Sequence, residues 1–250
     1  MIPPTSIDGT DITGATIDGT DVQEITVDGD VVFSAAPPIP TSTFLQYDAS
    51  ALTGLSNNDV VNTLTDNVGS NDASANQSPI YLQNEFNGLP IVRYGLNDTH
   101  LTTFSVVNQP FTAITVFKNF NYTGSGTNRV WTRPSFGQQD TNLSRTSSGY
   151  TMYAGNPGEV SSTRTDTSGI FACIFDGTNS ELRINGSTVA TGDVGNNTLG
   201  GIELAGQTFE NIFFASYDLA EHLFYDEDLR STNELAQEES RLSSKWGITI

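Results

Sequence analysis

Between residues 6 and 34, single aliphatic residues recur every five positions among polar residues. The six positions are Ile7, Ile12, Ile17, Val22, Val27 and Val32. An Asp-Gly pair follows every second one, at Asp8-Gly9, Asp18-Gly19 and Asp28-Gly29, so the segment repeats with a period of ten. Asp-Gly between β-branched residues favours a two-residue hairpin turn, because a type I′ turn needs positive φ at both central positions. The repeat therefore predicts a small module of β-hairpins.

Two arrangements of this module fit the spacing. If the strands run unbroken between the Asp-Gly turns, Ile12 and Ile17 lie on opposite faces. If the chain also turns near Gly14-Ala15 and Glu24-Ile25, all six aliphatic residues share one face, although Glu24-Ile25 suits a turn poorly. Six aliphatic residues are too few to hold a thirty-residue sheet together alone. We therefore predict that residues 1–34 anchor or oligomerise the protein through these six residues. The alternative is a short β subdomain packed on its own chain.

A second pattern begins after a proline-rich segment. Residues 35–41 include three prolines within four positions, which predicts a stiff, extended linker. Residues 42–250 then alternate short apolar runs with turns such as Asn87-Gly88 and Asn185-Gly186, a pattern typical of a β-sandwich or jelly roll. The expected strands are 90–94, 111–117, 129–131, 170–175, 180–184, 202–205, 210–217 and 222–225.

One segment has helical periodicity instead. Residues 231–246 begin with a capping box formed by Ser231 and Glu234, and Gly247 follows as a stop signal. Three apolar residues at i, i+7 and i+11 form one face. These residues are Leu235, Leu242 and Trp246.

The charge of the chain excludes several classes of partner. It has 29 acidic and 10 basic residues, a net charge of −19, and only two lysines. Such a field repels nucleic acids and anionic membranes. Acidic, lysine-poor surfaces are typical of proteins that work in concentrated salt, where self-repulsion is screened, so we predict a halophilic protein. The alternative is an ordinary acidic extracellular or phage protein. With 36% hydrophobic residues, 14 Phe and 8 Tyr, the chain still predicts a packed core.

Targeting and redox signals are few. The first residues lack the basic and apolar regions of a signal peptide, and no apolar run reaches the length of a membrane helix. We therefore expect no membrane insertion. Cys173 is the only cysteine, which excludes an intrachain disulfide, and its apolar surroundings predict a core position.

Several segments of residues 42–250 together resemble a known family. The ending Phe224-Tyr-Asp-Glu-Asp-Leu-Arg-Ser231, the helix and Lys245-Trp-Gly-Ile248 resemble the close of concanavalin A-like lectin/glucanase (laminin G-like) jelly rolls, with Arg230 as one extra residue. Earlier segments agree in order and spacing: Tyr47-Asp-Ala-Ser50, Phe86-Asn-Gly-Leu-Pro-Ile-Val-Arg-Tyr94, and Phe175-Asp-Gly-Thr with Arg183-Ile-Asn-Gly-Ser187. The resemblance implies an all-β concanavalin A-like jelly-roll sandwich with one C-terminal helix.

The family includes glycoside hydrolases, so catalysis must be considered. Those enzymes place carboxylates along one strand in patterns such as Glu-x-Asp-x-x-Glu, and this chain has no such triplet. We expect Glu203, Glu210 and the 226–228 acids to be solvated surface groups. His100 and His222 lack nucleophile or metal-ligand spacing. We therefore predict that the protein is not an enzyme.

Many laminin G-like lectins hold Ca²⁺ in rim loops, and this resemblance makes Asp98, Asp140 and Asp193 weak calcium candidates. Calcium needs six to eight converging oxygens, and convergence is not visible in a sequence.

Sugar binding needs exposed aromatic rings beside polar groups. The strongest candidates are Trp131 and Arg133 with Tyr150 and Tyr153, because long polar loops at 124–128 and 137–148 are expected beside them. The alternative is that Trp131 and Tyr153 fill the core.

The ten-residue repeat itself resembles N-terminal segments of structural proteins from haloarchaeal tailed viruses and related phages. The combined resemblances imply a non-enzymatic virion surface protein, a homo-oligomeric capsid turret, decoration or tail-fibre component. Its N-terminal module would contact other virion proteins, and its lectin-like domain would contact host glycans or a glycoprotein. The alternatives are a purely structural decoration protein and a carbohydrate-binding or carbohydrate-active lectin-like protein.

Overall fold

A computed structural model describes most of the chain. The described residues are 6–7, 10–11, 16–17, 20–21, 24–27, 30–34, 43–122, 126–134, 140–156, 158–208 and 213–250. The chain divides into two compact units, Met1–Ile39 and Pro40–Ile250.

The described residues of the N-terminal unit form three antiparallel strand pairs, as the repeat predicted. Ile7 pairs with Thr10, Ile17 with Thr20 and Val27 with Asp30, which leaves one Asp-Gly pair between the partners each time. The described strands form three separate two-stranded sheets. Ile12 and Val22 lie outside the described residues, and side-chain burial is described from residue 43 onward, so the aliphatic interface stays a prediction. The strands are β1 (Ser6–Ile7), β2 (Thr10–Asp11), β3 (Thr16–Ile17), β4 (Thr20–Asp21), β5 (Glu24–Val27) and β6 (Asp30–Ser34).

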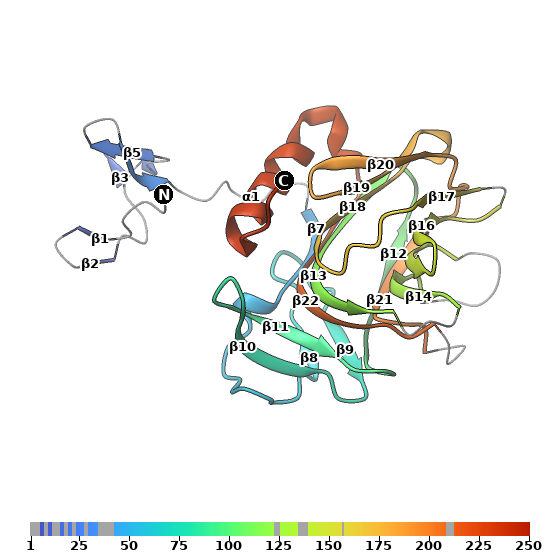
Figure 1. The fold of residues 1–250 in the computed structure, drawn as a ribbon, viewed down its shortest axis with the longest axis horizontal. Helices are drawn as coiled ribbons and strands as arrows, with labels where there is room; N and C mark the ends of the chain where they lie inside the picture. Colours follow the sequence, from blue (N-terminus) through green and yellow to red (C-terminus); the bar gives the residue numbers. More distant parts are fainter. Residues whose placement is uncertain are drawn as a thin grey trace. The chain divides into compact units, whose positions relative to one another are not determined.

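The second unit is a sandwich of two eight-stranded antiparallel sheets (Figure 1), which confirms the predicted jelly-roll class. In the first sheet, β7 pairs with β22 beside the main strand order. That order is β10 (Ile80–Phe86), β11 (Leu89–Tyr94), β22 (Ser216–Tyr225), β13 (Phe111–Asn121), β18 (Gly169–Phe175), β19 (Ser180–Ile184) and β20 (Ser187–Gly192), and β7 spans Thr43–Asp48.

The second sheet packs its apolar face against the first. Its order is β17 (Glu159–Ser162), β16 (Gly149–Tyr153), β15 (Asn142–Thr146), β14 (Asn128–Thr132), β21 (Leu199–Leu204), β12 (Thr99–Val107), β9 (Ala73–Asn76) and β8 (Thr63–Leu64). Short 3₁₀ turns are η1 (Ala49–Ala51), η2 (Gly177–Asn179) and η3 (Leu229–Thr232).

Aromatic rings fill the space between the sheets. The ring of Phe117 lies 4.3 Å from that of Phe171, and Tyr150 lies 4.6 Å from Phe171. Cys173 is fully buried in the same core, as predicted. Truncating one such ring to alanine typically costs about 3–5 kcal/mol, so this layer dominates the stability of the domain.

Both histidines are buried. His100 donates from Nε2 to the carbonyl of Val61 at 2.9 Å, so its Nδ1 accepts the Tyr94 hydroxyl at 2.8 Å. His222 contacts the Thr115 hydroxyl through Nδ1 at 2.9 Å. Burial lowers the pKa of His100 to about 4 and that of His222 to about 3, because neither site can solvate an imidazolium. Both side chains are therefore neutral parts of the interior.

The predicted helix forms as α1 (Glu234–Trp246), with its expected apolar face buried and Gly247 as its C-cap at φ +67°. The predicted capping box is wrong. Ser231 belongs to η3, where its hydroxyl donates to the carbonyl of Asp228, and Asn233 precedes the helix in the left-handed region. Within the described ranges, no helix is long and apolar enough to cross a membrane.

An ion cluster holds α1 on the first sheet. We define the α1 ion cluster as Glu221, Glu238, Arg241 and Lys245. Glu221 on β22 is fully buried and accepts Arg241 at 2.7 Å and Lys245 at 2.7 Å. Burial raises the pKa of Glu221, but the two cations outweigh it and hold that pKa below its usual value. The carboxylate is therefore charged and its partners are required.

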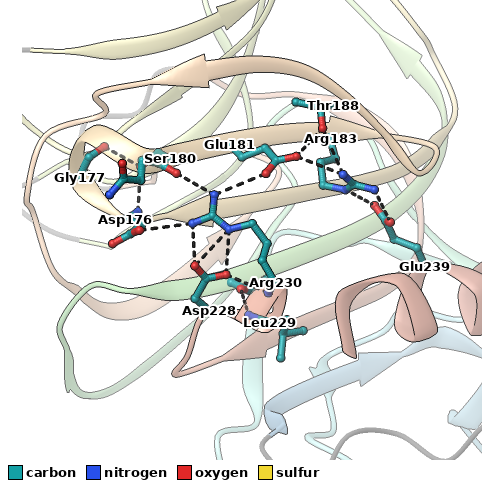
Figure 2. A network of polar contacts seen from close by, with 12 residues as sticks. Asp176, Gly177, Ser180, Glu181, Arg183, Thr188, Asp228, Leu229, Arg230 and Glu239 are labelled. Carbon is teal, nitrogen blue, oxygen red and sulfur yellow. Dashed lines mark hydrogen bonds and ion pairs between the residues drawn. The ribbon is translucent and has the colours of Figure 1, made fainter. Parts of the chain in front are cut away.

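A second polar network lies beside α1 and is shown in Figure 2. Arg183 on β19 binds Glu239 of the helix through two hydrogen bonds of 2.9 Å. Arg230 contacts Asp228 and Glu181, which joins η3 to β19. Arg183 and Arg230 are partly exposed, whereas Glu239 is buried, so the Arg230 contacts add little stability and the Arg183–Glu239 pair fixes the position of the helix.

Several strand predictions need correction. Residues 216–225 form one strand, β22, where the sequence suggested two. β15 occupies residues 142–146, which were expected to be loop. Glu203 was expected to be solvated but is fully buried on β21, where burial raises its pKa and one oxygen accepts the Thr208 amide at 2.7 Å.

Candidate functional site

A polar hollow of about 480 Å³ lies on the outer face of the second sheet, over β14 to β17. Antiparallel register places its lining in two rows that cross the strands. The first row is Arg129, Ser144, Thr151 and Ser161. The second row is Asn142, Tyr153 and Glu159. We call this surface the polar hollow.

The alternation of the strands explains why these side chains share a face. On the opposite face of the same strands, Leu143 pairs with Met152, which pairs with Val160, and all three are buried in the core. Because successive residues of a strand point to opposite faces, the polar partners must point outward. The same strand register therefore determines both which residues line the hollow and which residues pack in the core.

A β-bulge in β14 sets the wall of the hollow. Arg129 pairs with Ser144 and Trp131 pairs with Leu143, so Val130 is the extra residue. Without it, residues two apart would share one face. The bulge therefore allows Arg129 to point outward while Trp131 points into the core.

Arg129 is held rigidly in this wall. Its guanidinium forms an ion pair with Asp140, donates to the side chain of Gln207 and donates to the Thr132 hydroxyl at 3.1 Å. The Phe213 ring lies 4.4 Å from the guanidinium carbon, within the range of a cation–π contact. Arg129 is only 7% exposed. It is a fixed structural group at the edge of the hollow.

The other end of the hollow is more open. Glu159 is exposed, and one of its oxygens accepts the Ser161 hydroxyl at 3.0 Å. Tyr153 is half-buried between Asn142 and Glu159 in the second row. This end offers an aromatic ring, hydroxyls and a carboxylate to solvent.

A tight hairpin holds β15 against β16. Thr146 pairs with Gly149, and the Thr146 hydroxyl accepts the Ser148 amide at 3.2 Å. Gly149 has φ +146°, and a Cβ there would lie 1.7 Å from the carbonyl oxygen of Ser162. Only glycine allows β17 to approach this closely.

The four predicted sugar-binding residues fall in different places. Tyr153 lines the polar hollow. Trp131 and Tyr150 are fully buried among core rings, so neither presents a face to a ligand, and their prediction as binding residues is corrected. Arg133 lies outside the hollow lining and donates to the carbonyl of Thr198 at 2.9 Å. Strand parity explains the difference, since Tyr150 and Tyr153 are three residues apart and face opposite sides.

The three calcium candidates do not come together. Asp98 accepts the amides of Ser78 and Gly95, and Asp193 accepts that of Gly195. Asp140 is paired with Arg129. Within the described ranges, no three His, Cys, Asp or Glu side chains form a group suited to a metal ion.

Most residues of the polar hollow, Tyr153 excepted, were not predicted from the sequence. The runs Asn142-Leu-Ser-Arg-Thr146 and Glu159-Val-Ser-Ser162 each contain one apolar residue among polar ones, which is too little to establish the alternation of a half-buried strand. Each run is short and rich in Ser and Thr, so it resembled loop.

No protein-family model matches the sequence. No curated protein matches it either. Solved structures do resemble it. The Trypanosoma rangeli sialidase in complex with sialic acid has a TM-score of 0.58 at 10% identity, over 90% of this chain and 36% of the sialidase. Botulinum neurotoxin type C has a TM-score of 0.53 at 12% identity, over 80% of this chain and 52% of that chain. Cell entry of that toxin depends on interaction with two ganglioside molecules.

A mutant of the Trypanosoma rangeli sialidase that displays trans-sialidase activity has a TM-score of 0.56 at 11% identity, over 86% of this chain and 35% of that chain. The chain thus spans about a third of the length of the sialidases it resembles. At these identities the likeness concerns the fold alone, a β-sandwich.

Proposed function

We propose that the sandwich domain is a glycan-binding module whose ligand lies in the polar hollow. The observation that carries the proposal is the pair of side-chain rows, which combines hydroxyl, amide and carboxylate groups with the rings of Tyr153 and Phe213. Sugars offer many hydroxyls and an apolar ring face, so they need this mixture of hydrogen-bonding groups and aromatic surface. The lectin-like fold of the structural neighbours supports the same proposal.

The proposed binding is not catalytic. Among the described residues that line the polar hollow, Asp140 and Glu159 are the carboxylates. Asp140 accepts both Arg129 and the Thr132 hydroxyl, so it is not free to serve as a proton donor. Most glycoside hydrolases need two working carboxylates, although sialidases use a tyrosine nucleophile instead, so this argument applies to the two-carboxylate mechanism. A polysaccharide-hydrolysis screen that detects turnover would contradict this part of the proposal.

Replacing Tyr153 by alanine should weaken glycan binding roughly tenfold. Covering about 50 Å² of the ring is worth ~1.3 kcal/mol at about 25 cal/mol per Å², which corresponds to this factor. Glycan-array screening followed by titration calorimetry of the strongest ligand measures the change.

Two further variants control this experiment. Tyr153→Phe retains the ring and should bind within about twofold of the parent protein. Val106→Ala removes an exposed apolar group of β12 that is not part of the hollow and should leave binding unchanged. Equal binding by the parent protein and Tyr153→Ala would place the ligand elsewhere.

We further propose that the N-terminal hairpin module attaches this domain to a larger assembly, the surface of a virion working in concentrated salt. The module has no lysine or arginine, and its aliphatic residues repeat with the hairpins. Aliphatic residues at such regular spacing suit contact with other copies of the module or with another virion protein. The glycan-binding domain would then contact the host surface.

Deleting residues 1–36 should abolish assembly and leave a folded sandwich. The sandwich has its own core, and β7 begins only at Thr43. Sedimentation of both forms in low and multi-molar salt measures the mass. The variant Ile7→Ser/Ile17→Ser/Val27→Ser keeps the module length and should also fail to assemble. A monomeric full-length chain, or assembly by the truncated form, would contradict the anchor role.

A further inference from the structure

The charges in the polar hollow leave one carboxylate exposed. The charged residues in its described lining are Arg129, Asp140 and Glu159. Arg129 and Asp140 form an ion pair and cancel each other. Among the described residues, Glu159 makes one polar side-chain contact, with the uncharged Ser161 hydroxyl, so the described lining carries one net negative charge at its open end. A ligand in the hollow therefore meets an uncompensated carboxylate.

Arg129 cannot serve a ligand carboxylate without breaking its own contacts. Its Nη1 atom donates to Thr132 and Gln207, and Nη2 donates to Asp140. Phe213 packs against the guanidinium. An acidic sugar would have to displace Asp140, which is held in place by two hydrogen bonds. The positive charge of Arg129 is thus already neutralised by Asp140.

The rest of the chain offers the hollow no other cation. All ten Lys and Arg residues lie within the described ranges, and each except Arg133 and Arg145 has an acidic partner. Arg133 donates to the Thr198 carbonyl. Arg145, only 7% exposed, donates to the carbonyls of Thr146 and Gly149. The net charge of −19 adds a repulsive field for any anion.

A neutral sugar suits the same groups. An ionised carboxylate accepts hydrogen bonds at both oxygens, so Glu159 can accept a pair of neighbouring sugar hydroxyls. Ser144, Thr151 and Asn142 can donate and accept along the rest of the two rows. These groups can form hydrogen bonds with the hydroxyls of a neutral glycan without a cation.

We infer that the polar hollow selects neutral glycans over acidic ones, and that Glu159 is the residue that sets this preference. The inference rests on the proposed glycan-binding function. The sialic acid bound by the Trypanosoma rangeli sialidase carries a carboxylate, so a preference for neutral glycans would distinguish this chain from that sialidase. Like charges about 4 Å apart in water repel by ~1 kcal/mol, which corresponds to about fivefold in affinity.

Carboxyl reduction provides the matched test. Acidic glycans are arrayed both intact and after reduction of their carboxylates to hydroxymethyl groups, and the parent protein is applied at physiological salt. The reduced form should bind about fivefold tighter. Glu159→Gln keeps the size and hydrogen-bonding capacity of the side chain and should bring the two forms within about twofold. Asp226→Asn makes the same charge change at an exposed residue outside the hollow and should leave the fivefold preference intact.

The outcomes are distinct. If the intact acidic form binds as tightly as the reduced form, and Tyr153→Ala weakens both, the glycan function stands and the selectivity inference is overturned. If the preference persists in Glu159→Gln, Glu159 is not its source. If neither form binds, the proposed function fails and the inference fails with it.

Discussion

Arg241→Met should lower the free energy of unfolding by about 3–5 kcal/mol, because it leaves buried carboxylates without their main partner. Arg241 donates to Glu221 at 2.7 Å and contacts Glu238, and these acids are 0% and 1% exposed. Burial opposes the charge on Arg241, but the two acids outweigh it and raise its pKa. Chemical denaturation at neutral pH measures the loss.

An exposed ion pair serves as the control for this substitution. Arg164 pairs with Asp166, and its side chain is 45% exposed. Arg164→Met should change the free energy of unfolding by less than about 1 kcal/mol. Equal losses in the two variants would show that the α1 ion cluster is no more important than a surface pair.

Acidification from pH 6.5 to pH 4 should destabilise the sandwich by several kcal/mol through its two histidines. The unfolded chain binds protons with a histidine pKa near 6.5, whereas burial lowers the folded values to about 4 for His100 and about 3 for His222. The unfolded state therefore takes up more protons in this range, and stability falls as pH falls. Each histidine contributes about 3 kcal/mol at pH 4. Urea unfolding at pH 7, 6, 5 and 4 measures the slope.

Non-titrating variants isolate the histidine contribution. His222→Gln should remove about half of the slope between pH 6.5 and pH 4, whatever its effect on absolute stability. Folding lowers the pKa of acids such as Asp166 and Asp228, so these acids stabilise the fold at pH values above the pKa of an unfolded aspartate. This stabilisation is lost only when the pH falls below that pKa. An unchanged slope in the double variant His100→Gln/His222→Gln would contradict this account.

The sequence patterns predicted the parts of the fold that local periodicity determines. Apolar runs at 111–117 and 170–175 became the central strands β13 and β18, where both faces are buried. The spacing of Leu235, Leu242 and Trp246 gave the buried face of α1. These signals lie within single elements, so a local pattern is enough to find them.

The polar hollow could be predicted only in part, because its rows are made by register between four strands. Tyr153 was recognised as an aromatic residue in a polar setting, but Trp131 and Tyr150 carry the same local signal and face the core. The bulge at Val130 decides which residues of β14 point outward, and it is defined by pairing with β15. Glu203 was misplaced for a similar reason, since neighbouring strands determine its burial.

In β15, β16 and β17, the residues that pack in the core and the residues that line the polar hollow are different residues on opposite faces of the sheet. Leu143, Met152 and Val160 pack in the core, while their sequence neighbours lie on the opposite face of the sheet, where Asn142 and Ser144 are buried and Glu159 and Ser161 are exposed. Outward positions can therefore diversify without disturbing the interior, both in natural descent and in the laboratory. A combinatorial library restricted to Thr151, Tyr153, Glu159 and Ser161 would leave Arg129 and its contacts in place while it varies the outward side chains.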